Sequence, residues 1–262
     1  MLETRSPSGR PLASGAWLDA HHRAKLPERT AFCRRLSALR PRRVVDLGCG
    51  TGLWLSELDK HLPSTCEFIG VDADQSALAE AERRSAGWSR PVRFHLADLG
   101  IARPAIPEAD LSLLFNLSPY LPRVDALLAV LADQAQQVAV RQYDGAAVRF
   151  GPMRPEHRAT IEDSLSAAVS SSDQFRHYDL DRLYAALASA PFSERDISFE
   201  LFARRGPLPD ECWDYIAGTI EWTSQYLSPA ARELLQDWWQ PRVNDPALPI
   251  YFTELDLVAV LS

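Results

Sequence analysis

Short apolar runs alternate with amphipathic segments through the first half of the chain. The runs are rich in Val, Ile, Leu and Phe, as buried strands are, and the segments between them repeat apolar residues with a helical period. Strands are expected at residues 44–45, 66–71, 92–96, 111–114 and 138–143, and helices at 53–62, 75–85 and 126–136. This alternation predicts parallel βαβ units, and so an α/β protein with a doubly wound, mostly parallel sheet.

The second half of the chain is less regular. Helices are expected at residues 156–169 and 180–190, and a strand-like alternation follows at 197–203. Residues 210–239 are mainly helical in pattern and hold six aromatic residues, and a closing strand is expected at 251–261. The full pattern predicts a seven-stranded sheet of Rossmann-like topology, with a helical cap between its last two strands.

Four segments are expected from these elements. Residues 1–40 would hold a disordered start and a cap helix at 17–39, which Pro41 ends. Residues 41–205 would form the core, with an irregular insert after the fifth strand. Residues 206–249 would be a helical cap insert and 250–262 the closing strand of the core. Ligands of such a sheet bind at the carboxyl ends of its strands, so the cap is expected over that edge.

Length and charge narrow the class of partner. The chain has 262 residues, a formal net charge of -7 and a pI of about 5.4. The length suits one large α/β domain, or a core with a smaller cap. Nucleic-acid binders carry a basic footprint, which this chain lacks, so we expect no nucleic-acid partner. We also expect no membrane partner, because no apolar run reaches the length of a membrane helix.

Cysteine and histidine usage indicates the compartment and the absence of a metal. None of the four cysteines forms a CxxC pair, and the polar N-terminus has no hydrophobic signal core. Both features favour a reduced, cytoplasmic setting. The six histidines show no HExxH or HxxxH spacing, so no metal is expected. A homodimer is considered among the partners, although the sequence leaves the oligomeric state open.

A glycine-rich turn follows the first strand, in the sequence RVVDLGCGTGL. Such a turn between strand and helix lets the backbone approach a ligand closely, and its amides favour a polar or anionic group. The glycines are Gly48, Gly50 and Gly52, and Leu53 stands where a dinucleotide fingerprint would have glycine. Asp46 would repel a pyrophosphate but attract a sulfonium ligand that carries an ammonium group. The signs of these charges favour S-adenosylmethionine over a nicotinamide dinucleotide.

The segment DLGCGTG at residues 46–52 resembles the class I S-adenosylmethionine-dependent methyltransferases. Three further segments agree in register: FIGVDAD contains Asp72, HLADL contains Asp98, and ADLSLLFNLSPYL contains Asp110 and Asn116. The resemblance spans roughly residues 43–143. It implies the doubly wound fold of that family, S-adenosylmethionine as cofactor and methyl transfer as the reaction.

The resemblance also implies roles for individual residues. The acid at Asp72 is expected at the ribose hydroxyls, since one carboxylate can accept from two neighbouring hydroxyls. Asp98 corresponds to the family's contact with the adenine amino group. The residues expected to bind the cofactor are Asp46, Gly48, Cys49, Gly50, Gly52, Asp72, Ala73, Asp98, Leu99 and Asn116.

Each acid in this set has an alternative that needs no ligand. Asp72 could cap the helix that begins near Gln75. Asp98 could end its strand in a turn, and Asp46 could bind the amides of the loop. Cys49 is interpreted as a small filler within the loop rather than as a nucleophile.

Two polar clusters follow the fourth and fifth expected strands. The first, NLSPY at residues 116–120, is similar to the corresponding segment of small-molecule methyltransferases resembling trans-aconitate methyltransferase, with Tyr120 as its aromatic residue. It is also similar to the NPPY motif of nucleic-acid amino-methylating enzymes, but it has an extra residue and the chain is acidic. The second, RQYDG at 141–145, places polar residues at the mouth of a strand that should be nearly all apolar. Its last two residues could equally form a turn.

The candidate catalytic residues are Tyr120, Tyr143, Asp144 and His21, the last because imidazole titrates near neutral pH. The candidate acceptor-binding residues are Arg141, Arg149, Trp213, Trp222 and Tyr226. Inward-facing arginines would favour a carboxylate- or phosphate-bearing acceptor. The alternatives are surface salt bridges for the arginines and core packing for the aromatic residues.

These observations favour a small-molecule methyltransferase, because a large cap suits an enclosed acceptor better than an open protein surface. A protein or peptide methyltransferase is the first alternative. A protein that binds S-adenosylmethionine without transferring its methyl group is the second, and a nicotinamide oxidoreductase is the third. The acceptor and the atom that would be methylated do not follow from the sequence.

Overall fold

The computed structural model describes residues 14–100 and 104–262. Residues 1–13 of the predicted disordered start lie outside the described residues. The chain forms two compact units. Unit 1 comprises residues up to 142 together with 181–198 and 257–262, and unit 2 comprises 143–180 and 199–256. This division differs from the expected one, because the segment after the fifth strand joins the aromatic helices in one unit instead of belonging to the core.

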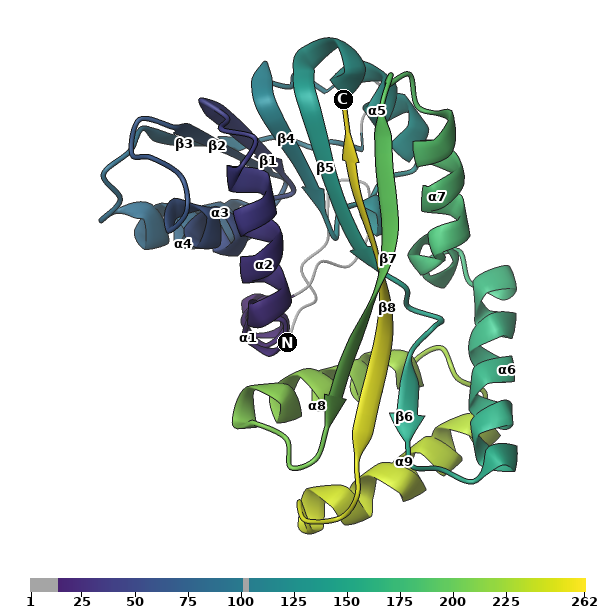
Figure 1. The fold of residues 1–262 in the computed structure, drawn as a ribbon. Helices are drawn as coiled ribbons and strands as arrows, with labels where there is room; N and C mark the ends of the chain where they lie inside the picture. Colours follow the sequence, from purple (N-terminus) through teal and green to yellow (C-terminus); the bar gives the residue numbers. More distant parts are fainter. Residues whose placement is uncertain (1–13, 101–103) are drawn as a thin grey trace. The chain divides into compact units, whose positions relative to one another are not determined.

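Unit 1 holds the βαβ units (Figure 1). Its strands are β1 (Arg43–Leu47), β2 (Glu67–Asp72), β3 (Val92–Leu96), β4 (Ala109–Phe115) and β5 (Ala135–Tyr143, which enters unit 2 at its last residue). Its helices are α1 (Gly15–Ala24), α2 (Leu26–Ser37), α3 (Leu53–Asp59), α4 (Gln75–Ser85), η1 (Ser118–Tyr120) and α5 (Val124–Gln134), with most of α7 (Leu180–Ser189). The single expected cap helix is thus two helices, which meet at Lys25.

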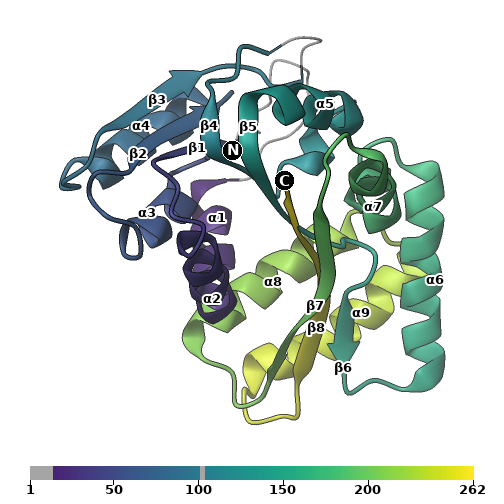
Figure 2. The same ribbon diagram turned by 45° about the horizontal axis from the view of Figure 1, so that its top comes forward.

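The sheet has eight strands in the order β3-β2-β1-β4-β5-β8-β6, and β7 pairs with β8. The first five strands pair in parallel. The order reverses at β1, so right-handed crossovers place α3 and α4 on one face of the sheet, as Figures 1 and 2 show. The predicted doubly wound, mostly parallel α/β fold is confirmed. The strand missed by the prediction, β6 (Arg149–Gly151), is only three residues long and therefore has no readable alternation.

The core of unit 1 lies between the sheet and the helices α2 and α3. It contains Phe32 and Leu36 of α2, Trp54 and Leu58 of α3, and Phe115 of β4. The ring of Trp54 lies 4.4 Å from that of Phe115, measured between centroids. Apolar burial of this kind contributes about 25 cal/mol per Å² and fixes these helices to the sheet. The carboxyl end of β1 and the loop after it are thereby held on a rigid base.

Unit 2 contains β6 and the greater parts of β7 (Arg195–Arg205) and β8 (Tyr251–Leu261). Its helices are α6 (Pro155–Ser171), η2 (Phe175–Tyr178), α8 (Asp210–Ser224) and α9 (Pro229–Asn244). β6 and β8 pair antiparallel. One face of this pair packs on α8 and α9, since Phe252 of β8 contacts Tyr215 of α8 and Phe150 of β6 contacts Trp238 of α9. Within the described residues, no helix is long and apolar enough to cross a membrane.

Candidate functional site

The loop after β1 adopts left-handed backbone angles at each of its glycines, with φ of 75° at Gly48, 53° at Gly50 and 76° at Gly52. A side chain is strained in this region, which explains the choice of glycine. Space is also limiting: a Cβ on Gly48 would lie 2.8 Å from Leu117 Cδ1, and one on Gly52 would lie 3.1 Å from Ala81 Cβ. Glycine is therefore required at these positions, where the backbone of the loop can be approached closely.

Asp72 ties this loop to the end of β2. Its Oδ2 accepts a 2.7 Å hydrogen bond from the Gly50 amide, and its Oδ1 accepts one of 2.9 Å from the Asp74 amide. Burial raises the pKa of Asp72, and these amide donors oppose that shift. The cap of α4 is Asp74, whose carboxylate accepts from the amides of Ser76 and Ala77. The helix-cap alternative considered for Asp72 thus applies to Asp74 instead.

Asp46 is the most enclosed acid beside the loop, with 1% of its surface exposed. Its Oδ2 has no hydrogen-bond partner among the residues that the structure describes. Burial raises the pKa of Asp46 to about 8, and the negative charge of Asp72 adds to this shift, whereas Arg29 opposes it. A buried carboxyl of this kind gains stability when a cationic group is bound beside it.

Arg29 of α2 is a buried cation, and its charge opposes the rise in the pKa of Asp46. Its guanidinium lies 4.5 Å from the centroid of the Trp54 ring, and its Nη1 donates to His22 Nδ1 at 2.8 Å. Burial and the charge of Arg29 lower the pKa of His22 to about 3. His22 is therefore a neutral hydrogen-bond acceptor at neutral pH. No pattern in the sequence distinguishes it from His21.

Helix α1 lies against the glycine loop, because Leu18 Cδ1 is 3.3 Å from the position that a Cβ on Gly50 would occupy. His21, predicted as a catalytic residue, is on this helix and is 3% exposed. Burial lowers its pKa well below the usual value, and the charges of Arg29, Lys25 and Arg141 lower it further. Its imidazole is neutral at neutral pH, and protonating it is unfavourable.

The remaining predicted cofactor residues lie where the strands of unit 1 end. Asp98, after β3, accepts a 2.8 Å hydrogen bond from the Gly100 amide, which is the turn considered as its alternative. Leu99 beside it is buried. Asn116, after β4, has a φ of 55°, which is uncommon for a residue other than glycine. Its amide donates to the carbonyl of Arg141 at 2.8 Å, so the ends of β4 and β5 are joined.

Tyr120 and Arg141 also lie at this edge of unit 1. Tyr120 ends the short helix η1 and is half-buried. Arg141, near the end of β5, is 3% exposed, and its guanidinium lies 5.9 Å from the Phe32 ring centroid. Arg141 is thus held inside the protein, which suits a binding role better than a solvated surface position does.

In unit 2, Tyr143 belongs to a cluster of aromatic rings. Its centroid lies 5.7 Å from that of Tyr178 and 6.4 Å from that of Trp222. Tyr226 lies 5.2 Å from Trp222 and 4.5 Å from Phe175. The structure therefore brings together three of the predicted residues, Tyr143, Trp222 and Tyr226, and adds the rings of Phe175 and Tyr178, which follow the irregular segment.

Asp144 forms the turn that was considered as its alternative. Its Oδ1 accepts from the Ala146 amide at 2.7 Å and from the Ala147 amide at 3.0 Å. Burial raises its pKa, and these two amides oppose the shift. A Cβ on Gly145 would lie 2.9 Å from Trp222 Cη2, so glycine is required beneath the ring cluster.

Trp213 and the arginines of the irregular segment lie apart from this cluster. Trp213 packs against Trp239 of α9 with 5.5 Å between ring centroids. It points away from the cluster because residues 213 and 222 lie on opposite sides of α8. Three arginines form exposed contacts with neighbours: Arg149 with Glu162, Arg154 with Glu156 and His157, and Arg176 with Asp173. These are the surface ion pairs named as the alternative for Arg149.

Buried acids in unit 2 were missed by sequence reasoning. Glu254 and Asp256 lie on the inward side of β8 and are 1% and 2% exposed. Tyr215 of α8 donates to Glu254 Oε2 at 2.5 Å, and burial followed by the charge of Glu254 raises the pKa of Tyr215. The signal was present in YFTELDLVAVL, where acids occupy the same alternating positions as Phe252.

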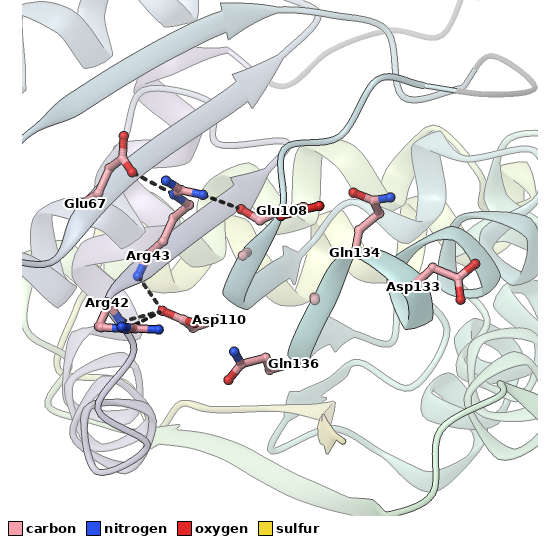
Figure 3. Close-up of a pocket in the computed structure, with 10 residues that line it drawn as sticks. Arg42, Arg43, Glu67, Glu108, Asp110, Asp133, Gln134 and Gln136 are labelled. Atoms are coloured by element: carbon pink, nitrogen blue, oxygen red, sulfur yellow. Dashed lines mark hydrogen bonds and ion pairs between the residues drawn. The ribbon is translucent and has the colours of Figure 1, made fainter.

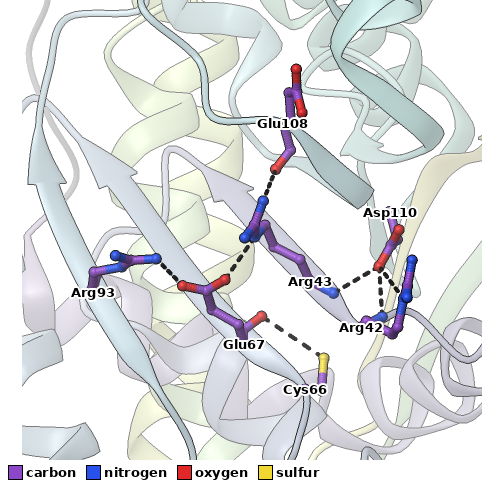
Figure 4. A network of polar contacts seen from close by, with 7 residues as sticks. All are labelled: Arg42, Arg43, Cys66, Glu67, Arg93, Glu108 and Asp110. Carbon is purple, nitrogen blue, oxygen red and sulfur yellow. Dashed lines mark hydrogen bonds and ion pairs between the residues drawn. The ribbon is translucent and has the colours of Figure 1, made fainter.

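A polar pocket of about 590 Å³ lies at the opposite edge of the unit 1 sheet, where the strands begin (Figure 3). Asp110 there accepts from the amides of Arg42 and Arg43, at 2.8 and 3.0 Å. The Arg43 guanidinium pairs with Glu67, which also pairs with Arg93 (Figure 4). Asp110 thus organises the amino end of β4, away from the glycine loop. Across the described residues, no group of His, Cys, Asp and Glu is placed to hold a metal ion.

The glycine loop and its surroundings fit S-adenosylmethionine. Gly48 and Gly50 have left-handed backbone angles and carry no side chain, so a ligand can approach the backbone there closely. The orphaned Oδ2 of Asp46 suits a bound ammonium or sulfonium charge, and it would oppose a pyrophosphate. The donor set of this site therefore agrees with the charge argument made from the sequence.

Comparison with known proteins supports the same interpretation. A family model described as a methyltransferase domain matches residues 44–138. A trans-aconitate 2-methyltransferase of Methylobacterium nodulans is 37% identical over 98 residues, which cover 37% of this chain and 36% of that protein. A protein-lysine N-methyltransferase of Schizosaccharomyces pombe is 36% identical over 32% of this chain and 34% of its own length. The matches thus span about a third of the length of these relatives.

Solved structures share the fold over most of the chain. A methyltransferase structure from Anaeromyxobacter dehalogenans has a TM-score of 0.56 at 19% identity, and the match covers 88% of this chain and 94% of that one. A phosphoethanolamine N-methyltransferase of Haemonchus contortus, in complex with phosphomonomethylethanolamine and S-adenosylhomocysteine, has a TM-score of 0.54 at 15% identity and covers 97% of this chain and 62% of that one. These similarities to solved structures show the fold, and the match to the methyltransferase domain covers residues 44–138 within it.

Proposed function

We propose that this protein transfers the methyl group of S-adenosylmethionine to a small-molecule acceptor. The observation that carries the proposal is the pairing of a glycine-rich loop with a buried carboxyl oxygen on Asp46 that has no hydrogen-bond partner among the described residues. A glycine-rich loop lets a nucleoside approach its backbone, and the acid selects a cationic donor. The matched methyltransferase domain supports the same reaction.

Several residues of unit 1 would hold the donor. Asp46 would face its ammonium group, Asp72 its ribose hydroxyls and Asp98 its adenine amino group. Gly48, Cys49, Gly50 and Gly52 would supply backbone contacts, and Ala73, Leu99 and Asn116 would line the remainder. Asp72 can take this role because a carboxylate oxygen accepts two hydrogen bonds, so each oxygen can bind a hydroxyl beside the amide that it already accepts from.

S-adenosylmethionine supplies a methyl carbon that its sulfonium already activates, so the protein mainly aligns the acceptor and excludes water. Such alignment contributes about 7–11 kcal/mol to catalysis. A base is required only for a protonated acceptor. We propose Tyr120, Tyr143 and Asp144 as groups that orient the acceptor or take its proton. His21 is proposed as a neutral hydrogen-bond acceptor, because burial and nearby cations disfavour its protonated form.

A carboxylate-bearing acceptor is the class we propose first. Arg141 supports it, since a buried guanidinium can bind a carboxylate through two hydrogen bonds. The similarity to a trans-aconitate methyltransferase supports it as well, because that relative's named substrate is a carboxylic acid. Arg149 supports it less, because Arg149 is engaged with Glu162 at the surface. Trp222 and Tyr226 would contribute apolar walls for the acceptor.

The protein-methyltransferase alternative keeps one specific observation in its favour, the similarity to a protein-lysine N-methyltransferase. A mass-shift screen distinguishes these possibilities. The protein is incubated with S-adenosylmethionine and separate sets of small acids, amines, phenols and peptides. We expect a gain of one methyl group among the small acids. Methylation confined to peptides would refute the small-molecule proposal.

The donor is tested separately by calorimetry. We expect S-adenosylhomocysteine to bind, and neither NAD nor NADP to do so. Binding of S-adenosylhomocysteine together with an empty acceptor screen would favour a protein that binds the cofactor without transferring its methyl group. Binding of NAD alone would refute the proposed donor.

A further inference from the structure

We propose that Arg84 of α4 is a positioning residue of the donor site, which fixes the glycine loop and helix α1 in place. This inference rests on the proposed function, because the ligand concerned is the methyl donor. The residue lies within the matched domain but outside the glycine motif and outside the four short segments that carry the resemblance. Helix α3 and strand β2 separate it in sequence from the loop that it contacts, and the fold brings the two together.

Arg84 holds one peptide group of the loop. Its Nε donates to the carbonyl oxygen of Thr51 at 2.9 Å. The amide of the next residue, Gly52, donates to the Cys49 carbonyl at 2.9 Å. The peptide group between Thr51 and Gly52 is thus bound at both its oxygen and its nitrogen, which fixes the orientation of the loop where α3 begins.

The same stretch of loop presents a polar atom with no partner. Thr51 is 7% exposed, and its Oγ1 makes no hydrogen bond to any described residue. Asp46 Oδ2, beneath the same loop, is orphaned as well. Two buried polar atoms left open beside one loop indicate that a ligand completes them. The peptide that Arg84 fixes is therefore part of the surface that the donor would contact.

Arg84 acts together with Ala81, which lies three residues earlier on the same face of α4. A Cβ on Gly52 would lie 3.1 Å from Ala81 Cβ, so the helix packs directly on the loop. Ala81 sets how closely α4 approaches, and Arg84 supplies the directional bond. The helix thereby serves as a clamp on one side of the glycine turn.

The guanidinium also reaches helix α1. Arg84 Nη2 lies 3.6 Å from Asp19 Oδ1, and the same distance from Glu80 Oε1 of its own helix. Asp19 is next to Leu18, whose Cδ1 approaches Gly50. One side chain thus joins three elements: α4, the loop after β1, and the helix that lies against that loop.

The contact of Arg84 with the Thr51 carbonyl should be stronger than its contact with Asp19. A hydrogen bond from a charged donor to a backbone carbonyl is stronger than an exposed ion pair, and the Asp19 side chain is 49% exposed. We therefore expect Arg84→Ala to weaken binding of S-adenosylhomocysteine roughly tenfold. Asp19→Asn, which leaves the Thr51 contact intact, should weaken it only about two- to threefold.

The experiment measures S-adenosylhomocysteine affinity by calorimetry, together with hydrogen–deuterium exchange of the peptide that contains residues 48–52. Arg84→Ala should accelerate exchange in this loop as well as weaken binding, and Arg84→Lys should fall between it and the wild type, since lysine keeps the charge but cannot bond to two groups in the same geometry. Arg83→Ala is the matched control, because Arg83 is exposed and pairs with Glu80 of its own helix. It should change neither measurement.

The outcomes separate this inference from the proposed function. If wild-type protein binds no S-adenosylhomocysteine, the proposed function fails. If wild type binds and a folded Arg84→Ala binds equally well with unchanged exchange in the loop, the positioning role is refuted. Should Arg84→Ala not fold, Arg84→Lys and Asp19→Asn decide the matter: wild-type affinity and wild-type exchange in both variants would overturn the proposal.

Discussion

Asp72 and Gly50 are joined by a 2.7 Å hydrogen bond from the glycine amide to the carboxylate, which links the loop after β1 to the end of β2. This bond explains why an acid at the end of the second strand matters even before any ligand is present. It orients both the loop backbone and the carboxylate that we propose for the ribose.

Replacing Asp72 with alanine should therefore weaken binding of S-adenosylhomocysteine at least tenfold, equivalent to about 1.4 kcal/mol. Asp74→Ala is the control, because Asp74 caps α4 and should cost about 1 kcal/mol of stability with little effect on affinity. Calorimetry and thermal unfolding measure the two effects. Unchanged affinity in Asp72→Ala would remove the ribose assignment.

Asp46 predicts a dependence of stability on pH. Its pKa in the folded protein is raised to about 8 by burial, above its value in the unfolded chain. The stability associated with its protonated form is thus fully present below the unfolded pKa and is lost as pH rises through about 8. The free energy of unfolding of Asp46→Asn should fall less than that of the wild type between pH 5 and pH 8.5, both measured by urea denaturation without ligand. Parallel curves would contradict this assignment.

We also expect Asp46 to release a proton when S-adenosylhomocysteine binds. A bound ammonium group lowers the pKa of Asp46, so S-adenosylhomocysteine should displace a proton at pH 7. Calorimetry in two buffers with different ionisation enthalpies measures this release. Asp46→Asn should bind more weakly and release fewer protons. Equal release in both proteins would place the ammonium group elsewhere.

Gly52→Ala tests the tightness of the loop. The left-handed backbone at Gly52 and the approach of Ala81 should together destabilise the folded protein by about 1–2 kcal/mol. Gly87→Ala is a fitting comparison, because a Cβ there meets no atom within 4 Å. It should alter the free energy of unfolding by less than about 1 kcal/mol. A well-tolerated Gly52→Ala would contradict the strained geometry.

Replacing Arg90, which lies away from the site, should cause a large loss of stability. Its guanidinium is buried, pairs with Asp59 and donates to the carbonyls of Leu62 and Cys66, among others. Arg90→Ala should cost about 3 kcal/mol or more, because the carbonyls lose their donor inside the protein. Arg93→Ala, at the surface, should cost less than about 1 kcal/mol. Urea denaturation measures the loss of stability in both variants. Similar losses would contradict this role of Arg90.

Tyr143→Phe tests the acceptor side. With an acceptor found by the screen, kcat should fall roughly tenfold while S-adenosylhomocysteine affinity stays unchanged, since the phenol hydroxyl is proposed to contact the acceptor. Tyr184→Phe, an exposed tyrosine of α7, is the control. A variant with full activity would remove Tyr143 from the proposed catalytic groups.

The class of fold could be predicted from the sequence alone, and so could the donor that we propose. Alternating strand and helix patterns fix a parallel sheet, and the spacing of Gly48, Gly50 and Gly52 after Asp46 depends only on residues near one another in the chain. Local sequence favours such turns, because glycine adopts left-handed backbone angles without the strain that a side chain brings. The acids Asp72 and Asp98 could be read in the same way, from their positions at strand ends.

The side chains that contact this loop from elsewhere in the chain could be found only in the packed structure. Arg84 and Leu18 contact the loop from two helices, and Arg29 of a third helix lies over the Trp54 ring. No local pattern marks these residues, since their roles depend on how the helices pack. The fold also separated Trp213 from the Tyr143 cluster and made His21 a neutral imidazole, because burial and neighbouring charges are properties of the packed protein rather than of the residue.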